Sequence, residues 1–109
     1  PNLVCEVADG KVRRREIDPL ELGVSRCAPE ALRGGEPAEN AQTIREIFSG
    51  GNGGRRDAVL LNAAGAIAAA GHARDLAEGL GLAREALDSG AAGERLDELI
   101  DFSRGEVVA

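Results

Sequence analysis

Residues 58–70 form an apolar run in which Asn62 is the one polar side chain. A helix over this run is apolar on every side, so it must lie at the centre of a core. The run is too short to cross a bilayer, which takes about 20 residues. We expect Asp57 to cap its N-terminus and Asn62 to be buried with a hydrogen-bond partner. Gly65 lowers helix propensity, so we also expect another backbone to pack closely against it.

Three amphipathic helices are predicted around this run. The first begins at Pro37, which suits a first helical turn, and ends at Gly50 and Gly51. The second is capped by Asp75 and stopped by Gly90, and the third covers residues 92–103. Their apolar stripes are Ala41, Ile44, Ile47 and Phe48; Leu76, Leu80, Ala83 and Leu87; and Leu96, Leu99, Ile100 and Phe102.

The N-terminal part predicts a β-hairpin. β-Prone residues 3–7 and 12–17 flank Asp9 and Gly10, a pair that favours a tight turn. Residues 18–35 contain two prolines and a glycine pair, which predicts an ordered loop with single helical turns at most. We expect residues 106–109 to fray. An isolated hairpin is only marginally stable in water. Three amphipathic helices also do not easily cover a helix that is apolar on every side. We therefore interpret the chain as an incomplete layer of a larger fold.

Composition narrows the class of protein. The 109 residues fit one domain, and 43% hydrophobic with 29% charged residues is typical of a soluble globular chain. A net charge of −6 argues against nucleic-acid binding, and we interpret Arg13–Arg15 as a solvated strand face. No apolar stretch suits a membrane span. We therefore expect a cytoplasmic location, with Cys5 and Cys27 reduced.

Residues 49–56, Ser-Gly-Gly-Asn-Gly-Gly-Arg-Arg, invite comparison with a phosphate-binding loop, since they contain two arginines and precede a helix. The spacing and the Lys-Ser/Thr ending of a Walker loop are missing, and Asp57 would itself occupy the anion position. We therefore favour a flexible connection between helices.

Other polar residues offer little chemistry. His72 follows the apolar helix, where a positive charge would stabilise the negative end of the helix dipole. We therefore prefer a structural or solvent-exposed role for His72 over that of a general base. Asp97, Glu98 and Asp101 lie on the polar side of an amphipathic helix and are preferred as solvated charges over a metal site. We assign no catalytic, cofactor-binding or metal-binding residue in this chain.

Three segments, in order, carry a family resemblance. Residues 32–41 (LRGGEPAENA), 56–66 (RDAVLLNAAGA) and 86–92 (ALDSGAA) closely resemble the closing portion of anthranilate phosphoribosyltransferases. The hairpin and residues 17–24 also resemble the stretch that follows that family's acidic metal-binding pair.

The resemblance implies an α/β fold of the glycosyltransferase family 3, nucleoside phosphorylase-like type. In that fold residues 1–109 are the C-terminal portion of the α/β domain, with a hairpin at 1–17, a loop at 18–35 and helices at 36–104. It implies a pentosyltransferase of tryptophan biosynthesis that uses Mg²⁺ to transfer phosphoribosyl from phosphoribosyl pyrophosphate to anthranilate. The family forms a homodimer through a helical domain that is not in this chain, so we do not expect this chain to dimerise alone.

The family's pyrophosphate loop, Lys-His-Gly-Asn segment and Asp-Glu metal pair have no match here. The resemblance therefore implies a non-catalytic scaffold part, inactive alone, whose partner is the missing N-terminal part of the same enzyme. Two alternatives stay open. One is a portion of a related nucleoside phosphorylase, and the other is a stand-alone, non-enzymatic interaction module with an exposed apolar patch.

Overall fold

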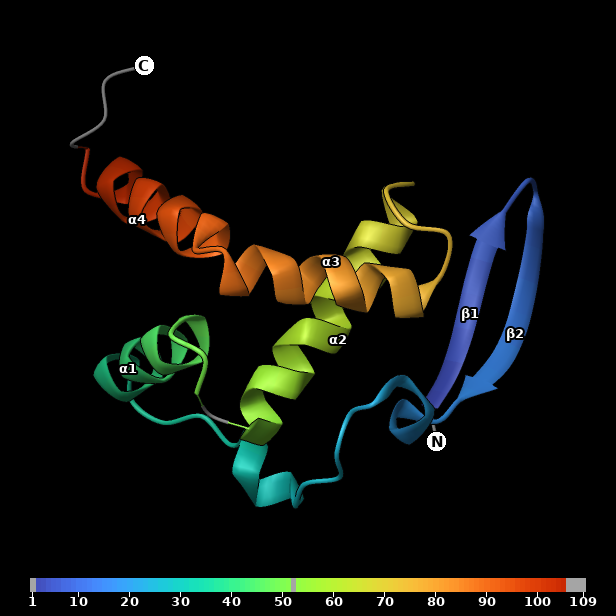
Figure 1. Ribbon diagram of the computed structural model, residues 1–109, viewed down its shortest axis with the longest axis horizontal. Helices are drawn as coiled ribbons and strands as arrows, with labels where there is room; N and C mark the ends of the chain where they lie inside the picture. Colours follow the sequence, from blue (N-terminus) through green and yellow to red (C-terminus); the bar gives the residue numbers. More distant parts are fainter. Residues whose placement is uncertain (1, 52, 106–109) are drawn as a thin grey trace.

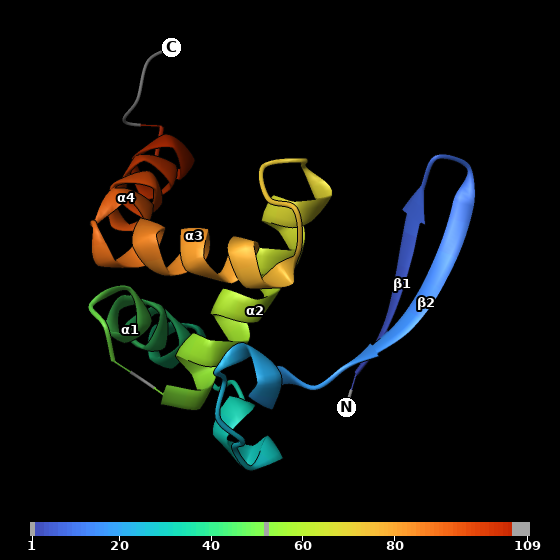
Figure 2. The ribbon, with the colours of Figure 1, turned by 45° about the vertical axis from the view of Figure 1, so that its right-hand side comes forward.

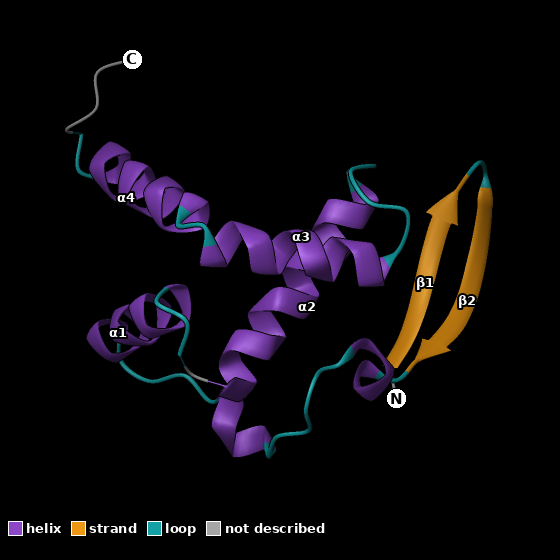
Figure 3. Cartoon of the chain, viewed as in Figure 1, coloured by secondary structure: helices purple, strands orange, loops and turns teal. Residues whose placement is uncertain are grey.

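The computed structural model describes residues 2–51 and 53–105. An antiparallel hairpin is followed by two short 3₁₀ turns and four helices, as Figures 1 and 3 show. The elements are β1 (Asn2–Ala8), β2 (Lys11–Ile17), η1 (Pro19–Leu22), η2 (Pro29–Leu32), α1 (Pro37–Phe48), α2 (Gly53–Ala69), α3 (Leu76–Asp88) and α4 (Ala91–Ser103). This order confirms the predicted hairpin, loop and helices, while the expected fraying of residues 106–109 concerns residues outside the described ranges.

The hairpin is in register from Asn2 opposite Ile17 to Ala8 opposite Lys11. Asp9 and Gly10 both have a positive φ, 52° and 75°, which is the conformation of a type I′ turn and matches the twist of the two strands. Figure 2 shows the hairpin standing at one side of the helices. Its residues are exposed or half-buried, so this ribbon contributes little to the core.

The core lies where α2 crosses α3. Leu60 and Ala64 of α2 are buried against Leu80, Ala83 and Leu87 of α3, as the predicted stripe of α3 requires. Val24 and Ile47 complete the buried cluster from the loop and from α1. Asp75 caps α3 by accepting a hydrogen bond from the Glu78 N–H at 2.9 Å, and Gly90 has a φ of 87° just after α3, so both predicted boundaries are confirmed.

The close backbone approach occurs at Gly79 and not at Gly65. A Cβ at Gly79 would lie 2.6 Å from the Ala64 carbonyl oxygen, whereas a Cβ at Gly65 would meet nothing within 4 Å. The prediction for Gly65 is therefore wrong. The glycine that permits the crossing belongs to α3, and Ala64, which is fully buried, is the residue of α2 that it contacts.

Two other predictions for α2 are wrong. The helix begins at Gly53, so Asp57 is an internal residue and not the N-cap. Asn62 is exposed and not buried, although it has the expected hydrogen-bond partner: its side chain donates to the Ala58 carbonyl one turn back at 2.8 Å. The reason is that α3, α1 and the loop cover only one side of α2, while Val59 and Ala66 on the other side stay exposed.

The apolar stripes of α1 and α4 are also only partly covered. In α1, Ile47 is buried but Ile44 remains 41% exposed. In α4, Leu99 and Phe102 remain 62% and 65% exposed. Among the described residues no helix is long and apolar enough to span a membrane.

Gly79→Ala should destabilise the chain by about 1–3 kcal/mol, because the added methyl group would force α2 and α3 apart. Gly81→Ala is the matched control, since a Cβ there meets nothing within 4 Å and alanine improves helix propensity by up to about 1 kcal/mol. Urea unfolding followed by circular dichroism measures both. Equal stabilities of the two variants would contradict the assigned crossing point.

Candidate functional site

The glycine- and arginine-rich segment 49–56 joins two helices, as expected, but the connection is shorter than predicted. Gly50, with a φ of 99°, and Gly51 follow α1, and residues 53–56 already belong to the first turn of α2. A helix beginning with two glycines has poor intrinsic propensity, so packing must hold it in place. The two arginines supply that packing.

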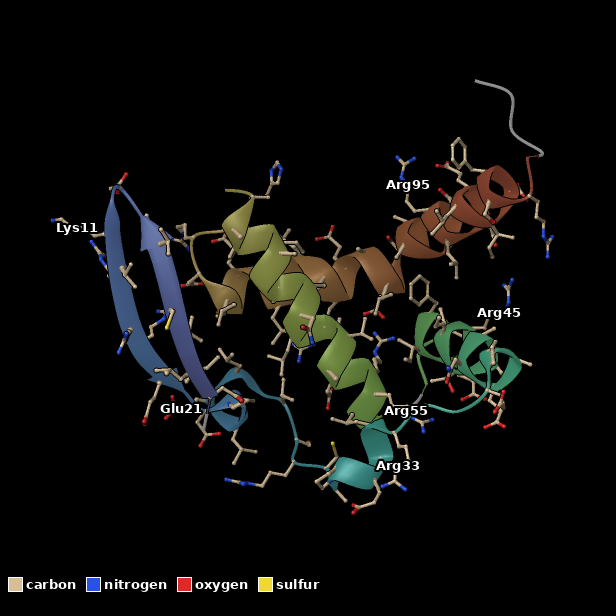
Figure 4. All side chains as sticks on the ribbon, turned by 180° about the vertical axis from the view of Figure 1, so that it is seen from behind. Lys11, Glu21, Arg33, Arg45, Arg55 and Arg95 are labelled. Carbon is tan, nitrogen blue, oxygen red and sulfur yellow. The ribbon has the colours of Figure 1, made fainter. Side chains whose placement is uncertain are left out.

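Arg55 ties three segments together at this end of the molecule. Its guanidinium donates to the Arg33 carbonyl at 2.8 Å and to the Thr43 hydroxyl at 3.5 Å. Arg33 follows η2 and Thr43 belongs to α1, so Arg55 fastens the loop and α1 to the start of α2. Figure 4 shows Arg33 and Arg55 side by side at this corner.

Arg56 is the more buried of the pair, with a side chain 15% exposed. It donates to the Ile47 carbonyl at the end of α1 at 3.0 Å and to an Asp88 oxygen at the end of α3 at 2.7 Å. One guanidinium therefore meets the C-termini of two helices, where backbone dipoles favour positive charge. Arg56 is therefore a structural contact between helices and not a solvated charge.

Asn40 holds the neighbouring loop. Its side-chain oxygen accepts from the Gly35 N–H at 2.8 Å, and its side-chain nitrogen donates to the Gly35 carbonyl at 2.9 Å. The amide thus satisfies both backbone groups of one residue, which fixes how the loop enters α1. The sequence patterns do not predict the roles of Asn40 and Arg56. The available signal was Arg56 itself, since a cation in the first turn of a helix is unfavourable unless it has another partner.

A pocket of about 210 Å³ opens between the loop and the first turns of α2. Its lining is mainly apolar, with Val24 and Leu61 on its walls and Cys27 close to Gly54. Its charged lining residues are Asp18, Arg26 and Asp57. It contains a thiol and two carboxylates but no histidine or lysine, so it offers no cysteine–histidine or lysine nucleophile for covalent catalysis.

The remaining candidate residues are spread over the surface. His72 is exposed beyond α2, and Cys5 and Cys27 are exposed, free thiols. The side chain of Arg74 forms a 2.7 Å ion pair with Glu78, and this hydrogen bond raises the pKa of the arginine. Asp97, Glu98 and Asp101 do not converge, and Glu98 instead accepts from Arg95 at 2.8 Å. Within residues 2–51 and 53–105 no three His, Cys, Asp or Glu side chains are grouped to hold a metal ion.

The most informative feature of the surface is its size. The chain exposes 7909 Å², whereas a folded monomer of 11.3 kDa exposes about 5,700 Å². Its radius of gyration is 15.7 Å, against about 13 Å for a compact domain of this length. The surplus of roughly 2,000 Å² has the size of a permanent protein interface.

Comparison with known proteins gives one consistent family. Residues 1–93 match the family described as "Glycosyl transferase family, a/b domain". A protein of Desulforudis audaxviator named anthranilate phosphoribosyltransferase is 53% identical over 103 residues, which is 94% of this chain and 30% of that protein. Proteins of the same name from Bradyrhizobium diazoefficiens and Azospirillum brasilense are 43% and 45% identical, over 96% and 98% of this chain. The chain spans about 30% of the length of these curated relatives.

Arg56→Lys should destabilise the chain by about 2 kcal/mol, because lysine cannot reach both helix ends with the fork that the guanidinium provides. Arg45→Lys, on the exposed side of α1, should change stability by less than about 0.5 kcal/mol. Thermal and urea unfolding of the two variants provide the comparison. If Arg56→Lys left the stability unchanged, the two hydrogen bonds of Arg56 would contribute nothing to the stability of the fold.

The isolated chain should bind neither Mg²⁺ nor phosphoribosyl pyrophosphate, because the acids of residues 2–51 and 53–105 are not grouped to hold a metal ion and Arg55 and Arg56 already have protein partners. Isothermal titration calorimetry tests this, with the full-length relative from Desulforudis audaxviator as the positive control. Micromolar binding of the pyrophosphate that depends on Mg²⁺ would contradict the prediction.

Proposed function

This chain belongs to the glycosyl transferase family and matches its α/β domain, and from that premise we propose that it is the C-terminal part of an anthranilate phosphoribosyltransferase. The single observation that carries the proposal is 43–53% identity to proteins of that name across nearly the whole chain. The family match confirms the resemblance inferred from residues 32–41, 56–66 and 86–92. The names of the relatives also favour this enzyme over a related nucleoside phosphorylase.

The proposed reaction joins the amine of anthranilate to the ribose carbon of phosphoribosyl pyrophosphate and releases pyrophosphate, as a step of tryptophan biosynthesis. Such a transfer depends on positioning the two substrates and on neutralising the charge of the leaving group. Mg²⁺ commonly supplies part of that charge in phosphate sites. The acids of the described residues do not fit such an ion, since no three of them are grouped. We therefore assign Mg²⁺ and both substrates to the rest of the enzyme.

The role of this chain is that of a scaffold. The surplus accessible surface and the exposed side of α2 support this role, since both leave apolar groups in water that an independent domain would bury. The partner that fits is the remainder of the same enzyme, because the relatives are about three times as long as this chain. The intact enzyme is proposed as a cytoplasmic homodimer whose subunit contacts lie outside this chain.

A chimera tests the proposal. This chain would replace the matching C-terminal part of the Desulforudis audaxviator relative, to which it is 53% identical. We expect the chimera to release pyrophosphate in the presence of anthranilate. A soluble, folded chimera that lacks this activity would contradict the proposed function.

Ala66→Asp in the chimera should lower that activity by at least about tenfold, because Ala66 lies on the side of α2 that the rest of the enzyme is proposed to cover, and a buried carboxylate is costly. Ala91→Asp is the control, since it places the same charge in the first turn of α4, where the helix dipole favours it. Initial rates of pyrophosphate release, with circular dichroism to confirm folding, give the readout. Equal rates for both variants would argue against burial of α2.

A further inference from the structure

The two strands of the hairpin differ sharply in charge. β1 reads Asn-Leu-Val-Cys-Glu-Val-Ala and carries a single charged side chain, Glu6. β2 reads Lys-Val-Arg-Arg-Arg-Glu-Ile and carries five. Both strands have one edge paired within the hairpin and one edge open, because the described sheet contains these two strands only.

β1 is mainly apolar, and one of its faces is apolar throughout. Successive side chains of a strand point to opposite faces, so Leu3, Cys5 and Val7 share one face, and residues 2, 4, 6 and 8 share the other, which includes the charge of Glu6. Val4 is half-buried and lines a hollow of about 360 Å³ together with residues of α2 and α3. On the opposite face Leu3 is 67% exposed and Val7 is 76% exposed. Strands in the interior of an α/β sheet are rich in apolar side chains because layers cover both of their sides, and β1, with one charged residue, is closer to that composition than β2.

β2 has the character of an edge strand. Charged side chains, lysine and arginine above all, are a usual means by which an edge strand avoids pairing with another chain. Lys11, Arg13 and Arg15 project to one face of β2, and Arg14 projects to the other. A further strand added beside β2 would have to cover cations on both faces.

We propose that the open edge of β1 receives a strand from the rest of the enzyme, so that β2 becomes the outer edge of the completed sheet. This inference rests on the proposed function, which identifies the rest of the same enzyme as the source of the added strand. The chain matches an α/β domain and spans about 30% of the length of its relatives, so most of that sheet is outside this chain. The same part of the enzyme is expected to cover Leu3 and Val7, which lie on the wholly apolar face of β1.

Amide hydrogen exchange in the active chimera tests the pairing residue by residue. Along each strand the N–H groups point alternately into the hairpin and toward its open edge. We expect the open-edge amides of β1 to exchange at least about 100-fold more slowly than those of β2, because only the former are hydrogen-bonded in the completed sheet. Similar rates at the two open edges, or slower exchange along β2, would overturn the inference. Protection of β1 that increases with protein concentration would assign the edge to a second copy and would also overturn it.

A matched pair of substitutions gives a second readout. Leu3 and Glu16 are opposite each other on the same face of the hairpin. Leu3→Lys should reduce the yield of folded, active chimera by about tenfold, since it places a charge on the strand that becomes interior. Glu16→Lys should leave the yield within about twofold, since β2 stays at the edge. Equal effects of the two changes would contradict the assignment of interior and edge strands.

The failure of the inference can be told apart from failure of the proposed function. An inactive, folded chimera refutes the proposed function whatever its exchange rates are. An active chimera whose β1 edge exchanges freely leaves the proposed function intact and refutes only the strand addition.

Discussion

The contact between Ala64 and Gly79 is the constraint on which the rest of the structure depends. It lets the backbones of α2 and α3 approach closely, so that Leu60, Leu80 and Leu87 can share one small core. Cores of this kind, filled with small and aliphatic side chains, tolerate little change in volume. The other elements are attached around this crossing: α1 through Ile47 and Arg56, and the loop through Val24.

Much of the local structure could be predicted from the sequence because the signals are local. Asp9 and Gly10 set the turn, Asp75 caps α3 through its own side chain, and Gly90 takes the left-handed conformation after it. The α3 stripe was likewise predicted, because its helical spacing matches the face that packs on α2. The family, too, could be recognised, since its motifs are contiguous stretches of chain.

The errors came from interactions between segments. A glycine inside a helix signals a close approach, but only the register of the crossing decides whether Gly65 or Gly79 makes it. The apolar run begins after Asp57 and therefore predicts the start of α2 there, whereas Arg55 and Arg56 hold one more turn through partners on α1, α3 and the loop. The same run predicts a central helix with Asn62 buried, but the described residues leave that side of α2 uncovered.

The turn at Asp9 and Gly10 also bears on the order in which this chain acquires structure. It joins two strands through two residues, and α2 and α3 are joined almost as directly, so the main contacts link segments that are near in sequence. Contacts of that kind form quickly, because little chain entropy is lost in closing short loops. The hairpin and the helix pair can therefore form early and separately, while addition of a strand to β1 has to wait for distant parts of the polypeptide. During that interval the charged side chains of β2 disfavour pairing of its open edge with other chains. The open edge of β1 lacks this protection, so it is the edge that a chaperone would need to cover to prevent aggregation.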